Sequence, residues 1–235
     1  MSGRATVMGN VAANLRRGRS ASYATDAHPV GTAAPADAAS WPQDLLVERF
    51  SAELTAIAGR VHRAATAREG IDAVIAVCRE HGASRVLSWA PEWIGIPGLH
   101  EALTAGGIEI DGGWIPDGRD RAERLAALDP IRVGITGATA GIAESGTIAV
   151  VSGPGRSRLA SLIVPVHVAV LKADRLYPSL PSLFAANPDI ADRGSNLVLI
   201  TGPSRTADIE MTLTRGVHGP AEIHVVLVDA AVRRD

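Results

Sequence analysis

The sequence predicts an α/β fold in which a mostly parallel sheet carries helices on both faces. Short apolar segments rich in β-branched residues alternate with segments whose apolar residues recur at helical spacing. Such alternation is typical of parallel sheets with helices on both faces. Glycine-rich turns follow two of these predicted strands, at residues 134–141 and 201–203, and are candidates for ligand contact.

Length and composition indicate one domain with a tail. The chain has 235 residues, 46% of them apolar, and a formal net charge of −2. We therefore expect a tail over residues 1–41, in which residues 6–19 can form a short helix, and a single α/β domain over residues 42–235. No apolar run approaches the roughly 20 residues of a membrane helix, and the balanced charge does not favour nucleic acid. No apolar segment follows Arg16-Arg17, as a secretion signal would require, so we expect a cytoplasmic protein. For the reasons of hydropathy and charge just given, we expect neither membrane nor nucleic-acid partners.

Cysteine content limits the redox chemistry of this chain. Cys78 is the only cysteine, so the chain can form no internal disulfide and cannot by itself ligate an iron–sulfur cluster or a cysteine zinc site. We expect no metal and no cofactor in this chain. The chain has one lysine against 22 arginines, so an isolated arginine carries little functional weight.

The first half of the chain alternates helices with strands. Apolar residues at steps of three and four from Leu46 to Val61 predict one long helix. A second helix over residues 68–81 places Cys78 on its apolar face and ends at Gly82. The further elements expected are a strand at 85–89, a helix at 99–105, a strand at 108–110, a helix at 122–128 and a strand at 131–135.

The second half contributes more strands than helices. Strands are expected at 147–151, 167–171, 197–200 and 222–228, with a helix between residues 177 and 186. His167 begins one of these strands and His224 alternates within another. Single histidines in such positions are more often structural than catalytic.

The segment 197–220 is the strongest candidate for a site. Its apolar strand ends at Thr201-Gly202-Pro203, and Ser204 or Thr206 can cap a following helix that carries Asp208 in its first turn and ends at Gly216. Ligands of open α/β sheets bind beyond the carboxyl ends of strands, where Ser204, Arg205 and the first helical N–H groups would lie. The alternative is that these residues only cap the helix. A regular helix over 206–214 would place His218 roughly 14 Å from Arg205. In that case His218 would belong to a turn or a partner surface, unless the helix crosses the end of the sheet.

Two motifs resemble a known family. Residues 202–210 (GPSRTADIE) with 216–220 (GVHGP), together with Ala143-Glu144-Ser145-Gly146-Thr147, resemble signatures of the lactate utilisation protein C family. The resemblance extends from about Leu45 to Val228. It implies a Rossmann-like fold of the sugar isomerase and coenzyme A transferase type with added antiparallel strands. It also implies a role in oxidising L-lactate to pyruvate beside partner subunits that carry iron–sulfur clusters.

A small carboxylate substrate would need a cation and a base. Arg205 is the first candidate for the cation, and His218 or His167 is the usual type of base. The residues expected at the site are Glu144 and His218 as catalytic residues, and Gly137, Thr147, Arg156, His167, Gly202, Ser204, Arg205 and Asp208 as substrate-binding residues.

Two other functions fit the same residues. Arg156, Arg205 and the glycine turns suit an anion, so the chain can instead be a metabolite sensor or scaffold without chemistry. Glu144 lies in a turn loosely similar to that of coenzyme A transferases, whose glutamate forms a thioester, so an acyl transferase is the third hypothesis.

Overall fold

A six-stranded parallel sheet forms the centre of the molecule. The computed structural model describes residues 41–206, 214–215 and 219–229. All neighbouring strands of the sheet are parallel. In spatial order, the strands are β1 (Arg60–Ala64), β12 (Glu222–Val228), β7 (Val166–Lys172), β4 (Val133–Gly137), β2 (Arg85–Ser88) and β3 (Glu109–Asp111).

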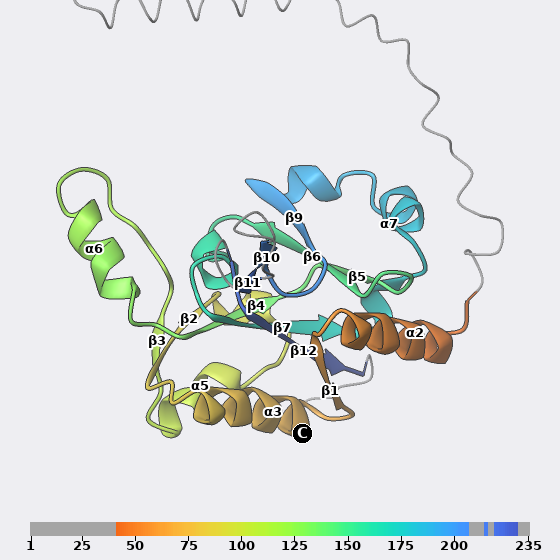
Figure 1. The fold of residues 1–235 in the computed structure, drawn as a ribbon, viewed down its shortest axis with the longest axis horizontal. Helices are drawn as coiled ribbons and strands as arrows, with labels where there is room; N and C mark the ends of the chain where they lie inside the picture. The colour runs from red at the N-terminus through yellow and green to blue at the C-terminus, as the bar shows by residue number, and fades with distance from the viewer. Residues whose placement is uncertain (1–40, 207–213, 216–218, 230–235) are drawn as a thin grey trace, which may run out of the picture. The chain divides into compact units, whose positions relative to one another are not determined.

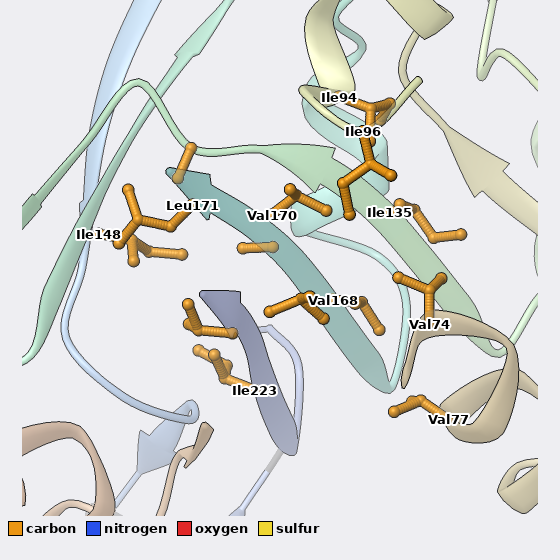
Figure 2. Packing of buried hydrophobic residues seen from close by; sticks show 14 of the residues in the cluster. Val74, Val77, Ile94, Ile96, Ile135, Ile148, Val168, Val170, Leu171 and Ile223 are labelled. Carbon is orange, nitrogen blue, oxygen red and sulfur yellow. The ribbon is translucent and has the colours of Figure 1, made fainter. Parts of the chain in front are cut away.

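The central strands are buried on both faces, which explains their continuous apolar character. Successive side chains of β7 point to opposite sides of the sheet. Val168 and Val170 point toward Val74 and Ile96, whereas Leu171 points to the side of Ile148 (Figure 2). The sheet therefore has an apolar layer on each side.

Helices cover both faces, as the sequence predicts. On one side lie α3 (Ala67–Glu80) and α5 (Leu99–Ala105), whereas α2 (Gln43–Ala56) lies on the other (Figure 1). Helix α4 (Pro91–Ile94) follows β2. The side chain of Thr66 accepts a hydrogen bond from the backbone N–H of Glu69 and so caps α3. The remaining helices are α6 (Arg121–Leu128) and α7 (Leu180–Ala186), with 3-10 turns η2 (Arg158–Ser161), η3 (Ala173–Arg175) and η4 (Ile190–Arg193).

A second sheet supplies the added antiparallel strands. Its order is β8 (Leu176–Tyr177), β5 (Ala140–Ile142), β6 (Thr147–Ser152) and β9 (Asn196–Ile200). The pairs β5–β6 and β6–β9 are antiparallel, and β5–β8 is parallel. One face of β6 packs into the main core through Ile148 and Val150, and the other packs through Ala149 and Val151 into a small cluster with Leu183 of α7.

The expectation of one helix from Leu46 to Val61 is wrong. Helix α2 ends at Ala56, and Val61 belongs to β1, where it pairs with Val225. Ala58 has a φ of 68°, and a Cβ added to Gly59 would lie 2.4 Å from Leu54 Cδ1, so the chain reverses tightly here. The helical spacing continued by coincidence, because Val61 is equally suited to a strand.

Two expectations about the segment 197–220 are also wrong. The strand β9 lies in the second sheet, antiparallel to β6, so its carboxyl end is not at the edge of the parallel sheet. Residues expected to be helical form β10 (Arg205–Thr206) and β11 (Thr214–Arg215), which pair as antiparallel strands. The capping signals therefore did not hold at the two ends of the expected helix, since these ends pair with each other as strands; residues 207–213 lie outside the described residues.

The order of the strands defines a switch point. From β2 the chain moves outward to β3, whereas β4, β7 and β12 follow one another toward the opposite edge. The direction changes between β2 and β4. In open α/β sheets the crevice beyond the carboxyl ends of such strands is the usual ligand site. No helix in the described part of the chain is long and apolar enough to cross a membrane.

Candidate functional site

A pocket opens at this switch point, beyond the carboxyl ends of β2 and β4. Its volume is about 380 Å³, which lies in the lower part of the range of small-molecule sites. Its lining residues are Trp89, Trp93, Gly137, Ala138, Thr139, Val151, Arg156, Arg175 and Arg193. The pocket thus combines two indole rings with three arginines.

The loop that follows β6 forms one wall of the pocket. Hydrogen bonds from residues at the end of β2 hold this loop in place. Trp89 Nε1 donates to the carbonyl of Ser157 at 3.0 Å, and the backbone N–H of Ala90 donates to the carbonyl of Gly155 at 2.8 Å. Gly155 has a φ of 69°, which favours glycine. These contacts place Arg156 against the pocket.

Arg156 is a buried cation without a carboxylate partner in the described residues. Only 8% of its surface is exposed. Its guanidinium carbon lies 4.2 Å from the centre of the Trp93 ring, and its Nη2 donates to the carbonyl of Arg193 at 2.9 Å. Its Nε is buried and has no hydrogen-bond partner in the same set.

Gly137 fits the pocket because a larger residue would displace α4. A Cβ at this position would lie 2.0 Å from the carbonyl oxygen of Trp93. The close approach of α4 to the end of β4 therefore depends on glycine. It also positions the Trp93 ring over Arg156.

Two more arginines border the pocket from its exposed side. Arg193 forms an ion pair with Asp189, with 2.7 Å between Nη2 and Oδ1, whereas Arg175 is exposed and has no ion pair within the described ranges. The three guanidinium groups carry three positive charges against one carboxylate. The pocket therefore favours an anion.

Other predicted residues lie on the second sheet. Thr147 Oγ1 lies 2.8 Å from Thr201 Oγ1, so it connects β6 to the end of β9. Gly202 and Ser204 line a separate hollow of about 260 Å³ that also contacts Ile223. The structure brings Gly137 and Arg156 together but does not bring these three residues to the same pocket.

Glu144 has a local contact in the structure. Its Oε1 accepts a hydrogen bond of 3.2 Å from the backbone N–H of Leu180, the first residue of α7, and its side chain is exposed. The contact satisfies one of the free N–H groups that begin every helix. The catalytic role expected of Glu144 stays a prediction.

His167 is fully buried in the second position of β7, toward the amino end of the sheet. Its Nε2 lies 2.8 Å from Thr136 Oγ1, and its Nδ1 has no hydrogen-bond partner among the residues described. Burial lowers the pKa of His167 to about 4. The imidazole is neutral near pH 7, at the opposite end of the strands from the arginine pocket.

The remaining predicted residues belong to the segment that follows β9. Arg205 begins β10, where its backbone pairs with Arg215. Asp208 and His218 lie outside the described residues. A strand rather than a helix begins at Arg205, so the anion contact expected of this residue stays a prediction without the helix N-terminus.

Several residues of the pocket were not predicted from the sequence. Trp93, Arg175 and Arg193 come from three segments far apart in the chain. Among 22 arginines, neither Arg175 nor Arg193 carries a distinguishing local signal. The position of Trp93 directly after the strand of Trp89 is the one feature that could have indicated it.

Cys78 does not provide a cluster or catalytic thiolate. It is fully buried on α3, and burial raises the pKa of its thiol to about 11. A neutral, enclosed thiol is a core residue.

Comparisons with known proteins identify the family. The LUD domain model matches residues 47–228. A lactate utilization protein C from Halalkalibacterium halodurans is 31% identical over 96% of this chain and 97% of its own. Another from Macrococcus caseolyticus is 30% identical over 65% of each chain, just under two thirds of that relative's length. A solved DUF162 family protein from Deinococcus radiodurans has the same fold, with a TM-score of 0.58 and 21% identity over 80% of this chain and 99% of its own. The chain belongs to the LUD domain family.

Proposed function

We propose that this chain is a subunit of a system that oxidises L-lactate to pyruvate and that it binds the small carboxylate at the switch-point pocket. The observation that carries the proposal is Arg156, a buried cation that the described residues leave without a counter-charge. A buried unpaired charge is unfavourable by several kcal/mol unless a partner arrives. The relatives named lactate utilization protein C support a hydroxy acid as that partner.

In this proposal the arginines bind and orient the substrate. The guanidinium of Arg156 donates charge-assisted hydrogen bonds to the carboxylate, and Arg175 adds a second cation at the mouth of the pocket. The ring of Trp93 excludes water from one side. These contacts fix the carbon that carries the hydroxyl.

The reaction itself requires an electron acceptor outside this chain. Conversion of lactate to pyruvate breaks one O–H and one C–H bond, forms the C=O double bond and releases two protons and two electrons. With a single buried cysteine, this chain cannot hold the clusters that would take the electrons. We assign them to iron–sulfur partner subunits, with this chain presenting the substrate.

Calorimetric titration of the purified chain with L-lactate and with pyruvate tests the binding. We expect Arg156→Gln to weaken the affinity roughly 10- to 100-fold, because a hydrogen-bonded charge contributes about 1.5–3 kcal/mol. Arg132→Gln is the control, since Arg132 is exposed at the start of β4 and outside the pocket. Absence of binding to either compound in the unaltered chain contradicts the site.

Reconstitution tests the role of the chain. Dye reduction that depends on lactate should require this chain together with its iron–sulfur partners, and Arg156→Gln should reduce it. If Arg156→Gln abolishes binding while dye reduction stays complete, the chain is a metabolite sensor or scaffold. If omission of the chain leaves dye reduction unchanged, it is not an essential subunit.

A further inference from the structure

Three potential metal ligands converge at the amino end of the parallel sheet, away from the arginine pocket. Glu222 and His224 lie at the start of β12, and His81 follows the last residue of α3. Glu222 Oε2 is 3.6 Å from His224 Nε2 and 3.8 Å from His81 Nε2. All three ligand atoms lie within 4.8 Å of one another.

Each of these three atoms is buried and has no hydrogen-bond partner in the described part of the chain. His224 is completely buried, and His81 has a side-chain exposure of 13%. A buried polar atom without a partner is unfavourable, and such atoms are uncommon in native proteins. Three of them directed at one point indicate a missing ligand.

The spacing suits a small divalent metal ion. Zinc binds imidazole nitrogen and carboxylate oxygen at about 2.0–2.2 Å, so tetrahedral ligands lie ~3.3 Å apart. The separations of Glu222 Oε2 from the two imidazole nitrogens, 3.6 Å and 3.8 Å, exceed this value by a few tenths of an ångström, and the two nitrogens lie within 4.8 Å of each other. Small side-chain rotations would therefore close the site.

A neighbouring histidine supports one of the ligands. His62 Nε2 lies 3.0 Å from His224 Nδ1, and the planes of the two rings are within 5° of parallel with their centroids 5.2 Å apart. Histidine ligands usually donate their second ring N–H to such an acceptor, which directs the other nitrogen at the metal. With Nδ1 as donor, His224 presents the lone pair of Nε2 to Glu222 and His81.

Arg60 is a positively charged neighbour of Glu222, and its charge competes with a metal ion for this carboxylate. Its Nη2 lies 3.3 Å from Glu222 Oε2, an ion-pair distance that does not meet hydrogen-bond geometry. Its Nη1 donates to Glu80 Oε1 at 3.0 Å, and half of its side chain is exposed. Arg60 can therefore remain paired with Glu80 while Glu222 turns to a metal.

We propose that His81, Glu222 and His224 bind one divalent transition-metal ion of the zinc class, with His62 as a positioning residue. The ion would connect the end of α3 to β12 and, through His62, to β1. The partly exposed Glu222 leaves a path for the ion and a fourth position for water. This inference does not depend on the function of the arginine pocket.

The full chain, treated with a chelator and then dialysed, is titrated with Zn²⁺ and separately with Co²⁺. We expect one ion per chain by elemental analysis and the visible spectrum of tetrahedral Co²⁺. His81→Gln and Glu222→Gln should each weaken binding at least 100-fold, and His62→Gln about 10-fold. The first two side chains lie at the edge of the fold, and circular dichroism confirms that their variants remain folded.

Glu80→Gln is the matched control, because Glu80 contacts the same Arg60 but is not one of the three ligands. It should bind the metal as the unaltered chain does. The proposal is overturned if the unaltered chain takes up no stoichiometric metal. It is equally overturned if His81→Gln and Glu222→Gln bind with unchanged affinity, since the ion would then occupy other residues.

Discussion

Asp111 and Arg156 are both buried charges near the carboxyl end of the sheet, but only Asp111 is neutralised by the protein. Asp111 is 7% exposed and Arg156 is 8% exposed. Asp111 forms ion pairs with Arg85 and Arg124 and accepts a hydrogen bond of 2.8 Å from the backbone N–H of Gly113. Arg156 contacts a carbonyl and an indole ring instead of a carboxylate.

The pKa of Asp111 reflects this compensation. Burial by itself would raise the pKa, but the hydrogen bond from Arg124, the N–H of Gly113 and the charge of Arg85 together hold it below its usual value. A buried charge that the protein neutralises is structural. A buried charge that the protein leaves unpaired marks a position for an external partner.

The largest effect on stability is expected for Asp111→Asn. It leaves Arg85 and Arg124 without their shared carboxylate, and loss of one partner of a buried ion pair lowers the free energy of unfolding by about 3 kcal/mol. Arg156→Gln removes a buried charge that has no carboxylate partner, so the free energy of unfolding should stay the same or rise. Urea unfolding of both variants, with the exposed Asp117→Asn as control, measures the contrast. Equal losses for the two variants would show that Arg156 has a structural partner.

His167 sharpens the comparison, because a histidine can lose its charge and an arginine cannot. Its pKa is about 4 in the fold, against 6.5 ordinarily. The unfolded chain therefore takes up a proton between pH 6.5 and pH 4 that the folded chain does not. The contribution of His167 to the free energy of unfolding should be fully present above pH 6.5. It should fall by up to ~3 kcal/mol as the pH decreases to 4.

Urea unfolding of the unaltered chain and of His167→Gln, at pH 7.5 and pH 4.5, isolates this contribution. The difference in stability between the two pH values should be smaller in the variant, because the other titratable groups are shared. The same pH dependence in both proteins would mean that His167 is protonated in the fold.

The smallest loss of stability is expected for Glu144→Ala. The variant loses the hydrogen bond to the N–H of Leu180 at the start of α7, which typically stabilises a helix by about 1 kcal/mol. Because Glu144 lies outside the arginine pocket, lactate binding by calorimetry should stay unchanged. Incubation of the unaltered chain with an acyl-coenzyme A and borohydride should leave its mass unchanged, whereas a reduced Glu144 would support the acyl transferase.

Much of the fold could be predicted from the sequence, because local patterns determine single elements. Helix α3 matches the expected residues 68–81 closely, and the strands expected at 167–171 and 222–228 are β7 and β12. Their apolar residues reflect burial on both faces, which holds wherever the strand lies in the sheet. The family resemblance, carried by two contiguous motifs, was likewise readable from the sequence and is confirmed.

The tertiary structure decided the partners of each strand and therefore the candidate sites. The sequence identifies 197–200 as a strand but does not specify its pairing with β6 in the second sheet. It marks Arg156 only as one arginine among many, whereas the fold buries it beside Trp93 without a carboxylate. It separates His81 from His224 by most of the chain, whereas the packing of α3 on β12 directs both at Glu222. Contacts between distant residues depend on strand order and packing, which no local pattern encodes.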